Sequence, residues 1–475
     1  MKERFNPFRG KKIAIVANKP PLSVVEREGQ EVLERSVGGL TASLEPLARN
    51  LQGQWFCTVK DSDAVLIKSL ATLPYSVFPL KLSEEEISRY YEGYANKQLW
   101  PLCHSFPTSS FFNEKDWPVY VQVNEKMADL VVRHVDEDTF IWVNDYHFFL
   151  LPSLLRKKNP RLQIGFFLHI PFPGEDIFKI LANRETLLEG LFGADLIGFH
   201  TSLYVKQFFS CVHAVFPGIK QEYNRLLIDH RQVAVQEFPI SIDYEKFCER
   251  AQSKAVQKKV KELKKAYRTE MVAISVDRLD YSKGPVEKLL AIEHFFDTYP
   301  EYCKTISFIQ LAVPSRIRID AYRQLKVEVD TTTGRINGKF ALDGWSPIHY
   351  IYNTLPIDDL VAHYVLSDLA LVLPLRDGLN LVSKEYVACR VNEDGALILS
   401  EFAGASEELK EAFLVNPYHK NLVADAIKKA IEMPQEEKRL RMCRLRERVE
   451  HHNVFHWMKD YFKAFDAVTT HYTVS

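Results

Sequence analysis

The chain has 475 residues, of which 46% are hydrophobic and 26% charged, and its formal net charge is −1. A chain of this length is too long for a single domain with one hydrophobic core, and it suits two domains of roughly 200 residues each. The near-zero charge argues against a nucleic-acid surface, and no apolar run reaches the roughly 18 residues of a membrane span.

The order of apolar and helix-like stretches predicts the architecture. In the first half, strands are predicted at 13–17, 140–143, 164–169 and 196–199, with helices at 148–158 and 177–193. After a charged helical stretch at 244–267, strands follow at 272–276, 306–311, 369–373, 396–400 and 413–415, and an aromatic helix at 452–467. Apolar strands alternating with helices indicate an α/β fold with doubly wound parallel sheets.

We therefore expect two Rossmann-like domains, at 1–242 and 243–453, and a last helix within 454–475 that returns to the first domain. Open sheets of this kind bind ligands outside the carboxyl ends of their strands. The two domains are expected to face each other across a cleft, with the chemistry at these strand ends.

Two strand ends of the first half carry candidate side chains. Asp145 and His147 follow the strand at 140–143, although Asn144 or Asp145 could simply cap the next helix. His169 ends the next strand, before a turn stiffened by two prolines. A histidine in that position is a better functional candidate than a lone core histidine.

In the second half, Arg278 and Lys283 follow a strand in a loop that ends at Gly284. Two cations and a glycine suit a diphosphate, and a solvated charged loop is the equally weighted alternative. Arg316 adds a cation after the following strand.

The strand at 369–373 runs into a dense cluster of polar residues. Asp377 and Gly378 form the turn, and Asn380 can cap the helix whose first amides, at Leu381 and Val382, can bind an anion. Glu385 lies one turn further, where a carboxylate can accept hydrogen bonds from sugar hydroxyls. An ordinary capped turn explains the glycine and the asparagine, but not why Arg376, Asp377, Lys384 and Glu385 crowd one strand end.

Other motifs carry little signal. The pair Gly38 and Gly39 before a helix is more often a turn than a phosphate cradle. The sequence contains no G-x-G-x-x-G after a strand, no P-loop and no H-E-x-x-H, and we expect no metal site. The seven scattered cysteines form no C-x-x-C pair, which favours reduced thiols and a cytoplasmic location.

Longer segments resemble glycosyltransferase family 20, the trehalose-6-phosphate synthases. In the family's order they are NDYHFFLLPSLLRKKNPRLQIGFFLHIPFPGEDIF, DRLDYSKG, GRINGKF, GWSPIHY, PLRDGLNLVSKEYVA and LSEFAGASEEL, and the likeness extends from about residue 13 to 465. The resemblance implies a GT-B fold and a retaining glucosyltransferase. It also implies that a nucleotide-glucose, UDP-glucose by family analogy, is the donor substrate, and that neither a metal nor another cofactor is needed.

The resemblance also implies roles for residues. Those expected to bind the donor are Gly38, Gly39, Arg278, Lys283, Leu381, Val382 and Glu385. Asp377 and His169 would contact the transferred glucose, and Arg278 and Lys283 would stabilise the leaving nucleotide. The residues expected to bind the phosphorylated acceptor are Lys19, Tyr91, Trp100, Asp145 and Arg316. The implied partners are small-molecule substrates, without nucleic acid or membrane, and a homo-oligomer is left open.

Two departures from the family pattern concern the acceptor. Lys19 stands where an arginine is usual, and Thr58 where a second tryptophan is expected, while LWPLCHSFP resembles glucosylglycerol-phosphate synthase. Three hypotheses follow: glucose 6-phosphate as acceptor, glycerol 3-phosphate as acceptor with ADP-glucose as donor, or a catalytically silent regulatory homologue. The four retained residues Arg278, Lys283, Asp377 and Glu385 argue against the third.

Overall fold

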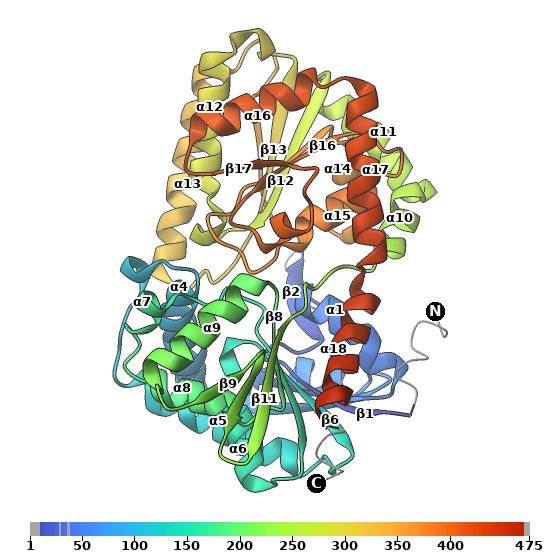
Figure 1. Ribbon diagram of the computed structural model, residues 1–475. Coiled ribbons are helices and arrows are strands. Elements are labelled where there is room, and N and C mark those ends of the chain that lie inside the picture. The colour runs from blue at the N-terminus through green and yellow to red at the C-terminus, as the bar shows by residue number, and fades with distance from the viewer. Residues whose placement is uncertain (1–9, 28–29, 36–38, 470–475) are drawn as a thin grey trace. The chain divides into compact units, whose positions relative to one another are not determined.

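The computed structural model describes residues 10–27, 30–35 and 39–469 (Figure 1). Contacts divide the chain into unit 1, Met1–Pro239 with Phe455–Ser475, and unit 2, Ile240–Val454. Among the described residues, no helix combines the length and the hydropathy that crossing a membrane requires.

Unit 1 is built on a nine-stranded sheet in the order β5-β4-β1-β6-β7-β8-β11-β10-β9. The strands from β5 to β11 are parallel, and β10 and β9 add an antiparallel edge. Their bounds are β1 (Lys12–Val16), β4 (Gln54–Lys60), β5 (Ser76–Leu82), β6 (Thr139–Asn144), β7 (Gln163–Phe167), β8 (Leu196–Phe199), β9 (Lys220–Glu222), β10 (Arg225–Ile228) and β11 (Arg231–Glu237). A separate hairpin pairs β2 (Leu22–Arg27) with β3 (Gln30–Arg35).

The helices of unit 1 follow the strands in sequence. They are α1 (Gly39–Asn50), α2 (Ala64–Leu70), α3 (Glu84–Glu86), α4 (Trp100–Cys103), α5 (Asp116–Val132), α6 (Leu151–Lys158), α7 (Glu175–Phe178), α8 (Arg184–Leu191), α9 (Ser202–Val215) and α18 (Val454–Thr469). Between α3 and α4 the chain forms a π-helix, η2 (Ile87–Leu99). Short 3₁₀ turns lie at η3 (Pro107–Ser109) and η4 (Tyr146–Phe148).

Unit 2 is a parallel six-stranded sheet in the order β14-β13-β12-β15-β16-β17. Its strands are β12 (Met271–Arg278), β13 (Ile306–Val313), β14 (Ile348–Tyr352), β15 (Leu369–Val372), β16 (Ala396–Ser400) and β17 (Phe413–Val415). From β12 the strand order proceeds outward in both directions. The topological switch point, where such sheets bind ligands, therefore lies between β12 and β15.

The helices of unit 2 alternate with these strands. They are α10 (Tyr244–Gln252), α11 (Lys254–Tyr267), α12 (Pro285–Thr298), α13 (Asp320–Phe340), α14 (Ile357–Leu366), α15 (Leu381–Cys389), α16 (Lys420–Glu432) and α17 (Gln435–His451), with 3₁₀ turns η5 (Tyr281–Lys283), η6 (Pro300–Tyr302) and η7 (Gly404–Glu407).

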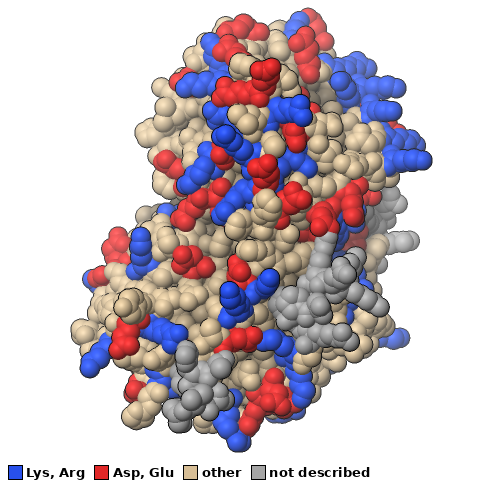
Figure 2. Space-filling model, turned by 45° about the vertical axis from the view of Figure 1, so that its right-hand side comes forward, with Lys and Arg blue, Asp and Glu red and all other residues tan. Residues whose placement is uncertain are grey.

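Charges of both signs are interspersed on the face of the molecule that Figure 2 shows, in keeping with the near-zero net charge.

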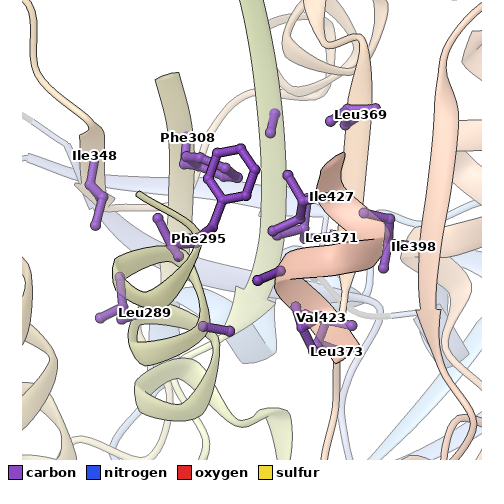
Figure 3. Close-up of a cluster of buried hydrophobic side chains, with 14 of the residues drawn as sticks. Leu289, Phe295, Phe308, Ile348, Leu369, Leu371, Leu373, Ile398, Val423 and Ile427 are labelled. Carbon is purple, nitrogen blue, oxygen red and sulfur yellow. The ribbon is translucent and has the colours of Figure 1, made fainter. Parts of the chain in front are cut away.

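The core of unit 2 lies where α12 and α16 cover the sheet (Figure 3). Phe295 of α12 and Ile427 of α16 have no exposed surface, and Leu371 of β15 is 1% exposed. Burying one such side chain contributes roughly 1.5–3 kcal/mol, so this core stabilises the sheet whose strand ends carry the candidate site residues.

The helix α18 packs on the sheet of unit 1. Trp142 of β6 is completely buried and stacks on Trp457 and Tyr461, with ring centroids 5.1 and 4.7 Å away. Phe462 meets the same indole edge-on at 5.6 Å. Contacts of this kind add to the hydrophobic gain of burial, so the last helix is part of the core of unit 1.

Two stretches that were predicted as single helices each form two helices in the structure. The stretch 244–267 is divided because the hydroxyl of Ser253 accepts a hydrogen bond from Val256 N and thereby caps α11. The stretch 177–193 is divided into α7 and α8, and the buried Leu181 lies in the turn between them. A capping serine interrupts the helical pattern at the first place and a turn interrupts it at the second.

Candidate active site

The switch point of unit 2 brings Lys283 and Asp377 together. Arg278 is the last residue of β12, and Lys283 follows in η5. Lys283 Nζ donates to Asp377 Oδ2 at 2.6 Å, and the two side chains are only 11% and 13% exposed. The pair places a cation and a carboxylate side by side at the switch point, where sheets of this kind bind ligands.

The turn that carries Asp377 is fixed on two sides. Asn380 Nδ2 donates to the carboxylate of Asp377 at 3.0 Å, and Asp377 N donates to Phe402 O at 3.1 Å. Asn380 Oδ1 accepts from Ser383 N at 2.9 Å, which confirms the predicted cap of α15. The first-turn amides of α15, at Leu381 and Val382, therefore lie beside Asp377, at a helix end that favours negative charge.

Glu385 lies in the second turn of α15, half-buried. Tyr364 OH donates to Glu385 Oε2 at 2.9 Å. Burial raises the pKa of Glu385, and the hydrogen bond from Tyr364 opposes the shift. One carboxylate oxygen is thus held by the protein, which orients the group.

Arg316 also belongs to unit 2, after β13. Its Nη1 donates to Asp280 Oδ2 at 2.7 Å and to Tyr322 OH at 2.5 Å, and the side chain is 5% exposed. Burial and the carboxylate of Asp280 raise the pKa of Tyr322. Arg316 is thus positioned by a buried carboxylate close to the turn that bears Lys283.

Lys384 does not join this cluster. Its Nζ donates to Glu408 Oε2 at 2.6 Å and to Ile240 O at 2.9 Å, with the side chain 2% exposed. The sequence places it next to Glu385, but on a helix successive side chains point in different directions. Adjacency in the sequence was therefore a poor guide to its partners.

In unit 1, Asp145 and His169 meet at the carboxyl ends of β6 and β7. His169 N donates to Asp145 Oδ1 at 3.2 Å, and His169 Nε2 lies 3.0 Å from Asn144 Oδ1. Asn144 Nδ2 donates to Trp142 O at 2.8 Å. The alternative that Asn144 or Asp145 caps the next helix is therefore wrong, because both side chains serve the neighbouring strand ends.

Asp145 has a backbone conformation, φ 75° and ψ 167°, that is essentially reserved for glycine. Such a conformation costs about 1–3 kcal/mol and is retained where the side chain has a function. The strain indicates that a carboxylate, and not a glycine, is needed at this point.

We expect Asp145→Gly to melt about 2–4 °C above Asp145→Ala while both lose activity, because both lose the hydrogen bond from His169 N and only glycine relieves the strain. Asp145→Ala is the matched control, since it also removes the carboxylate but keeps the strain. Differential scanning fluorimetry should place the glycine variant above the alanine variant, and equal melting temperatures would contradict the strain.

Burial lowers the pKa of His169 well below its ordinary value, and His200 adds to this effect. The unfolded chain therefore binds more protons than the folded one below pH 6.5. The contribution of the neutral imidazole to stability is present above the unfolded pKa and is lost as the pH falls below it.

Below pH 6.5 the free energy of unfolding should therefore fall by up to about 1.4 kcal/mol per pH unit on account of His169. In His169→Asn this contribution should vanish. Urea unfolding of both proteins at pH 7.0 and 5.5 measures the difference, and identical pH dependences would refute the assignment.

The predicted acceptor residues of unit 1 lie near the ends of β1 and β6. Tyr91, on the π-helix, stacks on His147 with ring centroids 5.7 Å apart and an interplanar angle of 11°. Trp100 lies 5.8 Å from Tyr146, next to His147. π-helical segments are rare and are frequently found at functional sites, so this one supports a role for Tyr91.

The residues that depart from the family pattern occupy the same region. Trp55 Nε1 donates to Lys19 O at 3.3 Å. The hydroxyl of Thr58 donates to Asn18 Oδ1 at 2.9 Å, and Tyr90 OH donates to the same oxygen at 3.0 Å. Asn18 was not among the predicted site residues, and the structure shows it to be the common partner of Thr58 and Tyr90.

The glycine pair is described only in part. Gly39 opens α1, and Gly38 lies outside the described residues. Among the residues that the structure describes, no cluster of three or more His, Cys, Asp or Glu side chains suits a metal ion.

Comparison with known proteins agrees with this architecture. The model of glycosyltransferase family 20 matches residues 11–467. The alpha,alpha-trehalose-phosphate synthase [UDP-forming] A of Dictyostelium discoideum is 39% identical over 98% of the chain, which spans 63% of that protein's length.

Two solved structures are similar to the chain at 30% identity and a TM-score of 0.86. One is an E. coli structure bound with UDP-2-fluoro glucose, with 96% of this chain and 99% of the other covered. The other is an alpha,alpha-trehalose-phosphate synthase (UDP-forming) from Burkholderia xenovorans in complex with glucose-6-phosphate, with 96% and 100% covered. These findings confirm the resemblance and the GT-B fold class. The chain belongs to glycosyltransferase family 20 and is a glycosyltransferase.

Proposed function

We propose that the protein is a retaining glucosyltransferase that moves glucose from UDP-glucose to glucose 6-phosphate and forms trehalose 6-phosphate. The observation that carries the proposal is the pair Lys283–Asp377 at the switch point of unit 2. Its cation suits a diphosphate and its carboxylate suits sugar hydroxyls, so one nucleotide sugar can engage both.

The donor is assigned to unit 2. Arg278 and Lys283 bind the diphosphate, with the amides of Leu381 and Val382 at the N-terminus of α15. Glu385 bonds the ribose through the oxygen that Tyr364 leaves available, and Asp377 holds hydroxyls of the glucose. The relative bound with UDP-2-fluoro glucose supports uracil as the base of the donor.

The acceptor is assigned to Lys19, Tyr91, Trp100 and Asp145 of unit 1, with Arg316 as a second cation for the phosphate. Lysine is a point charge without the bidentate geometry of arginine, so it fixes the phosphate less strictly. The relative in complex with glucose-6-phosphate favours that acceptor over glycerol 3-phosphate.

In the proposed reaction, the bond between the glucose anomeric carbon and the diphosphate breaks while the acceptor hydroxyl bonds to the same face of that carbon. The hydroxyl proton passes to the leaving phosphate oxygen. The protein contributes position and positive charge, from Arg278 and Lys283, and neither a protein nucleophile nor a metal ion is required.

The products of six substrate pairs test the proposal. UDP-, ADP- and GDP-glucose are each incubated with glucose 6-phosphate or glycerol 3-phosphate, with EDTA present, and products are identified by mass and by the NMR coupling of their anomeric protons. Trehalose 6-phosphate with retained configuration is expected from UDP-glucose. Glucosylation of glycerol 3-phosphate alone would overturn glucose 6-phosphate as the acceptor. Transfer only after a divalent metal is restored would overturn the metal-independent reaction.

All seven cysteines are described by the structure and all are free. This supports a reducing compartment, and we infer the cytoplasm as the location.

A further inference from the structure

Lys384 is a buried cation on the helix that we assign to the donor. It lies on α15, between the first-turn amides and Glu385, yet it donates to Glu408 at 2.6 Å and to the carbonyl of Ile240 at 2.9 Å. Its side chain is 2% exposed and that of Glu408 6%. Leaving a buried charge of this kind unpaired is strongly unfavourable. Lys384 therefore keeps its contacts with Glu408 and Ile240 O, and a movement of either partner acts on the other through the ammonium.

Ile240 is the first residue of unit 2, where the chain arrives from unit 1. The chain leaves unit 2 at Val454, whose amide donates to Ile242 O at 2.9 Å. The two crossing segments, defined here as residues 240–242 and 452–454, are therefore paired by this hydrogen bond. Lys384 links the pair to α15.

A second connection runs from Glu408 to the glucose side of the donor site. Glu408 N donates to Ala405 O at 3.1 Å, and Ala405 N donates to Leu379 O at 2.8 Å. In the same loop, Phe402 O accepts from Asp377 N. The loop 402–408 thus touches the Asp377 turn at one end and Lys384 at the other.

We propose that Lys384 is a positioning residue that couples donor binding at α15 to the crossing segments of the chain. This inference rests on the assignment of the donor to unit 2. A nucleotide that orders α15 and the Asp377 turn fixes the helix that carries Lys384 and, through the loop 402–408, its partner Glu408. Opening the crossing segments must then break the bond from Lys384 to Ile240 O. Since coupling between two sites is reciprocal, order in the crossing segments in turn favours the bound nucleotide.

Hydrogen exchange with UDP as the probe tests the coupling. In the wild-type protein, saturating UDP is expected to slow exchange of the Val454 amide by about fivefold or more. In Lys384→Met this slowing should disappear. Lys288→Met is the matched control, because Lys288 forms an equally buried pair with Asp277 in unit 2 but has no contact with the crossing segments among its described partners.

Loss of stability alone is separated from loss of coupling by a double variant. Lys384→Met with Glu408→Gln removes both buried charges, and the new amide oxygen can still accept from Arg448, which lies 3.5 Å from Glu408. The double variant therefore recovers stability without restoring the bond to Ile240. It should melt near the wild-type temperature and still show no UDP-dependent slowing.

Equal slowing in Lys384→Met and wild type would overturn the coupling, as would an unchanged wild-type exchange rate while calorimetry shows that UDP is bound. If calorimetry detects no UDP binding to the wild-type protein, the donor assignment itself fails. The two failures are thereby distinguished.

Discussion

Lys283→Ala is expected to lower kcat/KM by about a hundredfold or more. Lys283 is the preorganised cation of the proposed donor site, held by Asp377 at 2.6 Å and largely removed from water. Loss of one such electrostatic contact typically costs 10²–10³ in rate, because the developing negative charge on the leaving phosphate is no longer stabilised. Steady-state kinetics with UDP-glucose and glucose 6-phosphate measure the loss.

Lys304→Ala is the control, since Lys304 is a half-exposed lysine of the same unit, paired with Asp343 at 3.1 Å. It should keep the wild-type rate. Arg278→Ala should resemble Lys283→Ala, because both cations are assigned to the same diphosphate. A folded Lys283→Ala protein with wild-type kcat/KM would remove this residue from the donor site.

Trp142→Ala is expected to destabilise unit 1 by about 3–5 kcal/mol. The indole is completely buried between the sheet and α18, and its removal leaves Trp457 and Tyr461 facing a cavity. Native-state hydrogen exchange of the β6 amides should accelerate on the order of a hundredfold or more, because each 1.4 kcal/mol is about a tenfold change.

Trp345→Ala supplies the matched substitution in unit 2, where Trp345 is 7% exposed in the core beside Phe296. Exchange in β6 should be unaffected by this change. If Trp142→Ala leaves β6 exchange at the wild-type rate, α18 does not contribute to the stability of unit 1.

Most buried strands were predictable because the interior of a parallel sheet is apolar on both faces, although the interior strand β4 was missed. The segments 196–199, 396–400 and 413–415 coincide with β8, β16 and β17. β5 was missed because it lies at the sheet edge, carries Pro79 and is only partly buried, so its apolar signal is weak. β14 was missed for a similar reason, since it is an edge strand of the sheet of unit 2 and four of its five residues are half-buried.

The candidate site was predictable where a residue lies in the loop after a buried strand. Asp377 and Lys283 each lie in such a loop, after β15 and β12, and the structure brings them together. The Asn144–His169 contact and the Asn18 oxygen shared by Thr58 and Tyr90 were not predictable, because they depend on which strands are neighbours. That order arises from the packing of the whole sheet and leaves no trace in local sequence.

The position of α18 has a consequence for how the protein is made. Ribosomal synthesis delivers the chain from its N-terminus, and domains generally fold as they emerge. Unit 2 is continuous in sequence, whereas the core of unit 1 receives Trp457, Tyr461 and Phe462 only at the end. The apolar face around Trp142 therefore stays uncovered until α18 has been translated. Unit 2, although it is synthesised later than the first 239 residues, can complete its folding before unit 1 does.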